Sequence, residues 1–186
     1  MDHEKALIKA LKLAITAPES RRQHSLDLCC ELAAMCTPDE VTSYKPACRY
    51  RMIAPAVMCL ALAIHFEARG EPIEGQIAVG HVIQNRVGDD RYPDNACDVV
   101  KQGYYWQIYP IRHRCQFSFW CDGLSDDPKD KQSWYNSLYL ATVIDRLPDK
   151  TGGATHYHAD YVYPHWAVDG RVTAQIEGHI FYRIHN

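Results

Sequence analysis

Apolar residues form one long run in the chain, over residues 52–64, and a helix-compatible segment continues it to residue 69. Pro55 stands where the first turn of a helix tolerates proline, and Gly70 and Pro72 end the segment. Because the segment is apolar on all sides, it predicts a buried central helix. It is shorter than the roughly 20 residues that cross a bilayer, so no membrane span is expected.

A second helix is predicted from about residue 74 to residue 87, where valine and isoleucine recur on one face. Gly75 and Gly80 lie within it and would let a neighbouring element approach closely. Since only a short turn separates it from the first helix, the two helices are expected to form a tight hairpin.

The next segment, residues 91–127, is expected to be irregular, and its many aromatic side chains suggest a groove. A third helix is expected from about Lys129 to Leu147. Asp127 would be its N-cap and Pro128 would occupy its first turn.

After residue 153 the pattern changes to that of β-strands, rich in β-branched and aromatic residues. Strands are predicted over residues 154–163, 172–176 and 179–184, with Glu177 and Gly178 between the last two. The predicted fold class is therefore α+β, with helices first and a small antiparallel sheet near the C-terminus.

Ahead of this main domain, residues 49–186, the sequence predicts a helical N-terminal extension over residues 1–48. Two short helices are expected in it, at residues 4–17 and 26–35. The extension could pack against the main domain or act as a separate binding module.

Composition excludes two classes of protein. With 47% hydrophobic and 23% charged residues among 186, the chain is not disordered as a whole. Its 20 basic and 23 acidic residues give a net charge of -3 without a basic block, so no nucleic-acid partner is expected.

Eight cysteines raise the question of disulfides. Lysines interrupt the apolar positions of the N-terminus, so no Sec signal is visible, and reduced thiols are the default expectation. No C-x-x-C pair occurs to support a structural zinc. Cys59, inside the apolar helix, is interpreted as a small core residue.

Glu67 is the first candidate for chemistry. It shares a helix face with Leu60, Ala63 and Ile64 near the end of the most apolar helix. Desolvation there raises the pKa of a carboxyl group, and a protonated carboxyl can serve as a general acid. The structural alternative is that Glu67 pairs with Arg69 or Arg86 and closes the helix.

Several motifs in this order resemble the SleB-type cell-wall hydrolases, the spore-cortex-lytic enzymes and their relatives. The resemblance covers roughly residues 52–184 and rests on F-E-A-R-G-E-P at residues 66–72, Q-N-R-V at 84–87, Q-F-S at 116–118, C-D-G at 121–123, G-A-T-H-Y-H at 153–158 and G-H-I-F-Y at 178–182. It implies a peptidoglycan-cleaving fold related to lysozymes and lytic transglycosylases, with Glu67 as the catalytic acid/base.

The resemblance also implies that Gln116, Phe117 and Ser118 line the saccharide cleft, where amide, ring and hydroxyl would suit a sugar. Core packing is the alternative for Phe117. Glu71 is included as a substrate-binding candidate, although it lies beyond a helix break, which favours the alternative that it caps or orients that turn.

His156, Tyr157 and His158 complete the predicted substrate-binding set. In a strand His156 and His158 project to the same side, where they could hold a metal together with His165, His179 or Asp160. The resemblance favours the other interpretation, polar residues of the sheet under the sugar cleft. No catalytic zinc motif occurs, so neither a metal nor another cofactor is expected.

The expected function is thus cleavage of the MurNAc–GlcNAc bond of peptidoglycan, by transglycosylation or hydrolysis. Without a signal, the expected setting is a phage endolysin made in the host cytoplasm, released through a holin-type pore and acting on the wall. Two other functions stay open: a His-metal amidase or peptidase, and a non-catalytic wall-binding module.

Overall fold

A computed structural model describes residues 54–168 and 170–184. The predicted extension, residues 1–48 with its two helices and four of the eight cysteines, lies outside the described residues, so the domain boundary at residue 49 stays a prediction.

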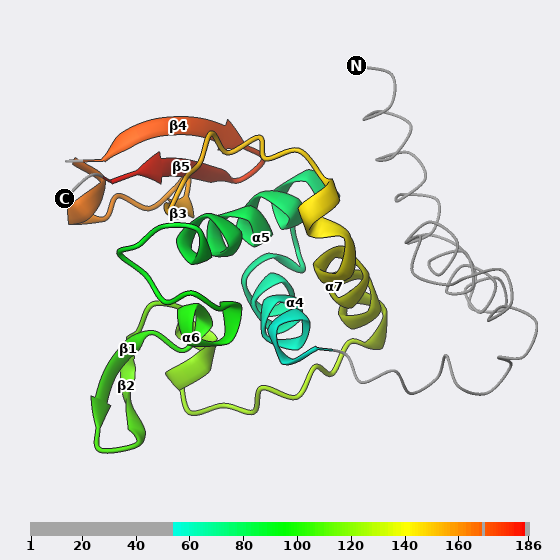
Figure 1. The fold of residues 1–186 in the computed structure, drawn as a ribbon, viewed down its shortest axis with the longest axis vertical. Coiled ribbons are helices and arrows are strands. Elements are labelled where there is room, and N and C mark those ends of the chain that lie inside the picture. Colours follow the sequence, from blue (N-terminus) through cyan, green and yellow to red (C-terminus); the bar gives the residue numbers. More distant parts are fainter. Residues whose placement is uncertain (1–53, 169, 185–186) are drawn as a thin grey trace, which may run out of the picture. The chain divides into compact units, whose positions relative to one another are not determined.

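Three helices form the core of the domain, and the two predicted first are confirmed closely. Helix α4 spans Pro55–Ala68 with proline at its start, and α5 spans Ile73–Val87 after the turn at Gly70 and Pro72. Helix α4 packs against α5, against α6 (Ala96–Val100) and against α7 (Lys131–Val143), which makes it central, as its all-round apolarity predicts (Figure 1). None of the described helices has both the length and the apolarity to cross a bilayer.

Gly80 shows why α5 can lie so close to its neighbours. A Cβ atom at this position would clash with Cδ1 of Ile144 and lie 3.1 Å from Cδ1 of Ile64. Any larger residue would therefore force these two buried side chains to move. Gly75, the other predicted close contact, faces the side chain of Glu71 in the preceding turn.

The third helix begins later and ends earlier than predicted. Helix α7 spans Lys131–Val143, because Asp130 rather than Asp127 caps it by accepting from the backbone N–H groups of Gln132 and Ser133. A short 3-10 turn, η3 (Ile144–Arg146), follows it.

The expectation that residues 91–127 are irregular is wrong. They contain a short helix, α6 (Ala96–Val100), a hairpin of β1 (Gly103–Trp106) and β2 (Tyr109–Cys115), and a 3-10 turn, η2 (Ser118–Cys121). The strands pair antiparallel with a register shift, so their side-chain pattern does not show a simple period of two.

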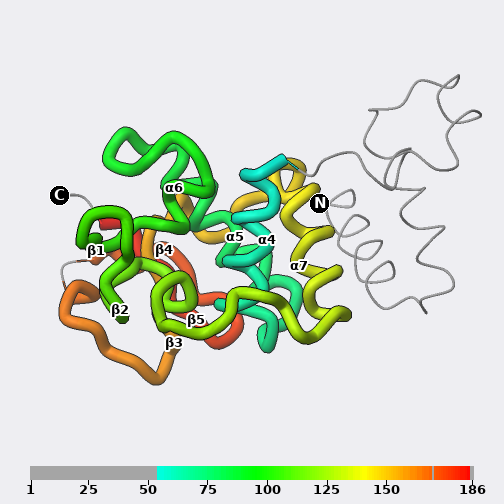
Figure 2. The backbone as a smooth tube through the Cα atoms, turned by 90° about the horizontal axis from the view of Figure 1, so that it is seen from below, coloured from blue at the N-terminus to red at the C-terminus, as the bar shows by residue number. Residues whose placement is uncertain are grey.

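The predicted C-terminal sheet is confirmed as antiparallel, in the order β3-β5-β4. Its strands are β3 (His156–Ala159), β4 (Arg171–Ile176) and β5 (His179–Arg183), and a 3-10 turn, η4 (His165–Val168), precedes β4. Strand β3 is shorter than predicted. One face of the sheet covers α5, where Phe181 packs on Ala78 and Val82 (Figures 1 and 2).

Disulfides correct the expectation of reduced thiols for the four described cysteines. Cys59 on α4 is bonded to Cys97 on α6, and Cys115 at the end of β2 is bonded to Cys121 in η2. Cys59 is therefore half-buried and cross-linked rather than a free core residue. Spacing could not reveal these pairs, because they depend on how α4, α6 and the hairpin meet.

Candidate active site

Glu67 lies in the last turn of α4 and faces β3. Its Oε2 accepts a hydrogen bond from the hydroxyl of Tyr157 at 3.3 Å. Its Oε1 is buried and has no hydrogen-bond partner among the described residues. One carboxyl oxygen is thus held in place, while the other keeps its hydrogen-bonding capacity for a further group.

Burial raises the pKa of Glu67 above its ordinary value of 4.5, as predicted. The hydroxyl of Tyr157 and the nearby backbone N–H dipole of Ser118 act in the opposite direction, because both stabilise the carboxylate. Within the described part of the chain, no second carboxylate contributes to this shift. Glu67 interacts with Tyr157 and Ser118, and not with Arg69 or Arg86 as the structural alternative proposed.

Tyr157 is brought to Glu67 by strand alternation. It lies in β3 with its ring stacked near Phe181, on the sheet face that covers α5. Burial and the charge of Glu67 raise the pKa of the Tyr157 hydroxyl well above 10. The hydroxyl therefore keeps its proton and remains a donor at neutral pH.

Residues Asn85 and Arg86 at the end of α5 hold β3 in this position. The amide of Asn85 donates to the Ala154 carbonyl at 3.0 Å, and Nε of Arg86 donates to the Thr155 carbonyl at 2.7 Å. These bonds fix the two residues that immediately precede β3, and hence they place Tyr157 opposite Glu67.

The guanidinium of Arg86 is itself buried between two rings, 5.3 Å from the centroid of Tyr92 and 5.4 Å from that of Phe117. Burial lowers its pKa, and its Nη1 has no hydrogen-bond partner among the described residues. Cation–π contacts offset part of the cost of burying this charge.

Glu71 joins the α4–α5 turn to the β4–β5 turn. Its Oε2 accepts from the backbone N–H of Gly178 at 3.3 Å and lies 3.9 Å from Nδ1 of His179. The ring of His179 in turn meets the ring of Tyr157 edge-on, with centroids 5.2 Å apart. Glu71 therefore orients the β4–β5 turn, a contact that the sequence did not predict, and it connects to Glu67 only through His179 and Tyr157.

The predicted cleft residues Gln116, Phe117 and Ser118 divide into three environments. Ser118 is exposed, and its backbone N–H reaches Glu67. Phe117 is 2% exposed beneath Arg86, so its alternative interpretation, core packing, is the observed one. Gln116 is exposed, and its backbone N–H donates to the Gln102 carbonyl.

His156 and His158 project from the face of β3 opposite to Tyr157, where both contact the ring of Trp166. His158 is buried. Its Nδ1 lies 2.8 Å from the carbonyl oxygen of Ala159, and its Nε2 lies 2.9 Å from the hydroxyl of Tyr182. The structure therefore does not bring these two histidines to Glu67. The described residues also contain no group of three His, Cys, Asp or Glu side chains able to hold a metal.

A family profile described as Cell Wall Hydrolase matches residues 70–182, which begins just after Glu67 and includes Asn85, Arg86 and Tyr157. The chain belongs to the Cell Wall Hydrolase family.

Relatives of this cell wall hydrolase include spore cortex-lytic enzymes. That of Halalkalibacterium halodurans is 31% identical over 128 residues, which are 67% of this chain and 34% of the relative. That of Bacillus subtilis is 43% identical over 44 residues, 24% of this chain and 14% of the relative. The chain thus spans about a third or less of the length of these relatives.

Among solved structures, the cell wall hydrolase resembles the catalytic domain of the germination-specific lytic transglycosylase SleB from Bacillus anthracis. The identity is 26% and the TM-score 0.52, over 72% of this chain and 99% of that domain. The likeness supports the α+β fold with helices and a small antiparallel sheet.

Sequence reasoning missed the supporting residues of this cell wall hydrolase site. His179 was considered only as a metal ligand, and Arg86 only as a partner for Glu67. The Q-N-R-V motif was a usable signal for Asn85 and Arg86, but their bonds to the segment before β3 depend on a contact between distant segments.

Proposed function

We propose that the chain is a peptidoglycan-degrading enzyme that cleaves the MurNAc–GlcNAc bond with Glu67 as its single general acid/base. The observation that carries the proposal is the carboxyl group of Glu67: its pKa is raised by burial, one oxygen is held by Tyr157 and the other is buried without a partner. Membership of the Cell Wall Hydrolase family supports the substrate class.

The reaction that best fits one acid is lytic transglycosylation. Protonated Glu67 gives its proton to the glycosidic oxygen as the C1–O bond breaks. The resulting carboxylate then takes the proton of the 6-hydroxyl of the same MurNAc while that oxygen bonds to C1. A 1,6-anhydro ring closes, Glu67 regains its proton, and no water is consumed.

Two observations support this route over hydrolysis. Hydrolysing glycosidases usually need a second carboxylate, and Glu71, the candidate nearest in the sequence, accepts from the backbone N–H of Gly178 instead of facing Glu67. The solved relative from Bacillus anthracis is named a lytic transglycosylase.

The test is a digest of purified peptidoglycan analysed by mass spectrometry. Wild type should give ends that are one water lighter than reducing ends. Glu67→Gln should lower the rate by about 10²–10⁴-fold while keeping the fold, since the amide cannot transfer a proton. A variant with more than a tenth of wild-type activity would refute the catalytic role, and a digest with only reducible ends would indicate hydrolysis.

The same digest separates the other two functions. An amidase or peptidase would release stem peptides and lose activity on chelation with EDTA, whereas a wall-binding module would give no product. Both ring nitrogens of His158 already have partners, which argues against its use as a metal ligand.

For the biological setting we propose a phage endolysin that is made in the host cytoplasm, leaves through a holin-type pore and acts on the cell wall. The two disulfides favour an oxidising site of action and would then form after release. Co-expression in a bacterium tests this setting: cells should lyse with a pore-forming partner and remain intact without it.

A further inference from the structure

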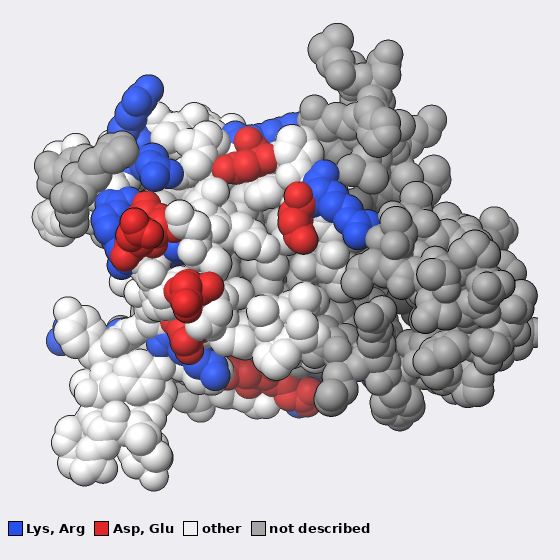
Figure 3. All heavy atoms as spheres, in the orientation of Figure 1, with Lys and Arg blue, Asp and Glu red and all other residues white. Residues whose placement is uncertain are grey.

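The hairpin of β1 and β2 presents large apolar side chains to solvent. Four of them form what we call the aromatic arm, with exposed fractions of 68% for Tyr104, 69% for Trp106, 79% for Ile108 and 62% for Tyr109. The hairpin projects from the domain (Figure 1), and its surface in the space-filling view is almost free of charged side chains (Figure 3). A contiguous apolar surface of this kind usually marks a binding site.

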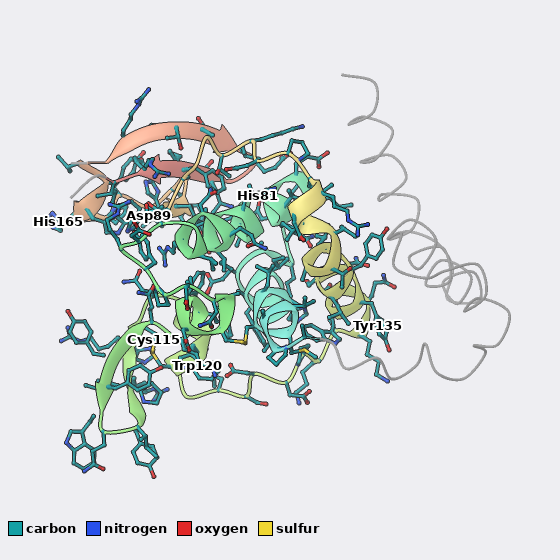
Figure 4. All side chains as sticks on the ribbon, in the orientation of Figure 1. His81, Asp89, Cys115, Trp120, Tyr135 and His165 are labelled. Carbon is teal, nitrogen blue, oxygen red and sulfur yellow. A yellow bond between two sulfur atoms is a disulfide. The ribbon has the colours of Figure 1, made fainter. Side chains whose placement is uncertain are left out.

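The arm is anchored firmly at its base. The Cys115–Cys121 disulfide joins the end of β2 to η2, close to Trp120 (Figure 4). The indole N–H of Trp120 donates to the hydroxyl of Tyr105 at 3.0 Å, and that hydroxyl donates to the Lys101 carbonyl at 2.7 Å. Because the base of the arm is already held in place, binding of a ligand would cost little conformational entropy of the protein.

One cation lies beside the rings of the arm. The guanidinium of Arg114 is 6.0 Å from the centroid of the Tyr104 ring, whereas Nε of Arg112 donates to the carbonyl of Asp122. Trp106 and Tyr109 are direct cross-strand partners, so their rings lie on the same face of the hairpin. The arm thus offers flat rings for an apolar surface and a cation for a carboxylate.

The base of the arm lies near the candidate active site. Strand β2 leads through Gln116 and Phe117 to Ser118, whose backbone N–H lies near Glu67. Trp106 and Tyr109 stand at the opposite, turn end of the hairpin, so a ligand that contacts both them and Glu67 must be extended.

We propose that the aromatic arm binds a glycan strand of peptidoglycan at a distance from the cleaved bond. Sugar rings would stack on Trp106 and Tyr109, since the C–H faces of a pyranose are apolar, and a carboxylate of the stem peptides would lie near Arg114. This inference rests on the proposed function, because it names a second contact with the same substrate.

The experiment measures co-sedimentation of the full chain with purified sacculi, in a Glu67→Gln background so that the wall stays intact. Trp106→Ala combined with Tyr109→Ala should weaken binding about tenfold or more, since exposed aromatic anchors dominate such sites. Tyr135→Ala is the matched control: it removes an aromatic side chain that is 53% exposed on α7, on the other side of the domain (Figure 4), and should leave binding unchanged.

Thermal unfolding of the arm variant should match that of the parent, because both side chains are mostly exposed. The inference is overturned if sacculi bind equally well, or if binding falls only together with the unfolding temperature. It is also overturned if the variant loses binding to vesicles of phosphatidylglycerol and phosphatidylethanolamine but not to sacculi, which would make the arm a membrane anchor.

Cleavage by the wild type distinguishes the two proposals. If wild type leaves peptidoglycan uncut while Trp106 and Tyr109 still control binding to sacculi, the proposed function fails and the arm stands. If wild type cuts the glycan and the arm variant binds normally, the function stands and the inference about the arm fails.

Discussion

At the scale of single residues, the acidity of Glu67 is a balance between burial and its polar neighbours. Burial raises its pKa, and the hydroxyl of Tyr157 and the nearby backbone N–H of Ser118 lower it. A balance of this kind tunes a carboxyl group toward the pH at which it must both give and take a proton.

Tyr157→Phe should therefore raise the pKa of Glu67 further, because the carboxylate loses a donor. We expect the alkaline limb of the pH profile of kcat/KM to move to higher pH, since Glu67 stays protonated longer. Tyr182→Phe is the control, because its hydroxyl bonds His158 on the other face of the sheet. An alkaline limb that stays in place, or moves to lower pH, would show that Tyr157 does not tune Glu67.

At the scale of elements, two disulfides fix the pieces that position the site. Cys59–Cys97 ties α4 to α6 across 38 residues of chain, whereas Cys115–Cys121 closes a loop across 6 residues at the base of the hairpin. Cross-links stabilise mainly by restricting the unfolded chain, and the effect grows with the length of the closed loop.

From this loop-length dependence, removing Cys59–Cys97 by paired alanine substitutions should cost about 4 kcal/mol, and removing Cys115–Cys121 about 2 kcal/mol. Urea unfolding of the two double variants measures the difference. The expectation fails if the variant that lacks Cys115–Cys121 is the less stable of the two.

At the scale of the whole molecule, stability should depend on pH through buried histidines. Burial lowers the pKa of His65, His81, His156 and His179, in the case of His156 to about 4. The folded state then binds fewer protons than the unfolded state below pH 6.5, so stability present above that pH is lost as the pH falls toward 4. Glu67, whose pKa is raised, acts in the opposite sense.

We expect His156→Asn to flatten this loss between about pH 6.5 and pH 4, by an amount on the order of 1 kcal/mol once solvent screening is considered. The measurement is the slope of the unfolding free energy against pH. Lost packing against Trp166 would lower the unfolding free energy equally at every pH and would leave this slope unchanged. His113→Asn, on the exposed hairpin, is the control. An unchanged slope in His156→Asn would contradict the proposed role of His156.

Local signals in the sequence determined much of this fold. Proline and glycine bounded α4 and α5, all-round apolarity made α4 central, and β-branched strands around Glu177 and Gly178 predicted the sheet. The position of Glu67 at the end of α4 followed from the same pattern. These features could be predicted because period, caps and turn residues act within a few positions of one another.

The tertiary structure alone decided what Glu67 meets. Tyr157 lies 90 residues later in the chain, and it reaches Glu67 only because Asn85 and Arg86 hold the start of β3. Packing also decided three further features. They are the two described disulfides, the hairpin at residues 103–115, and the orientation of His156 and His158 away from Glu67. Each depends on contacts between segments far apart in the chain, whose register and facing no local period encodes.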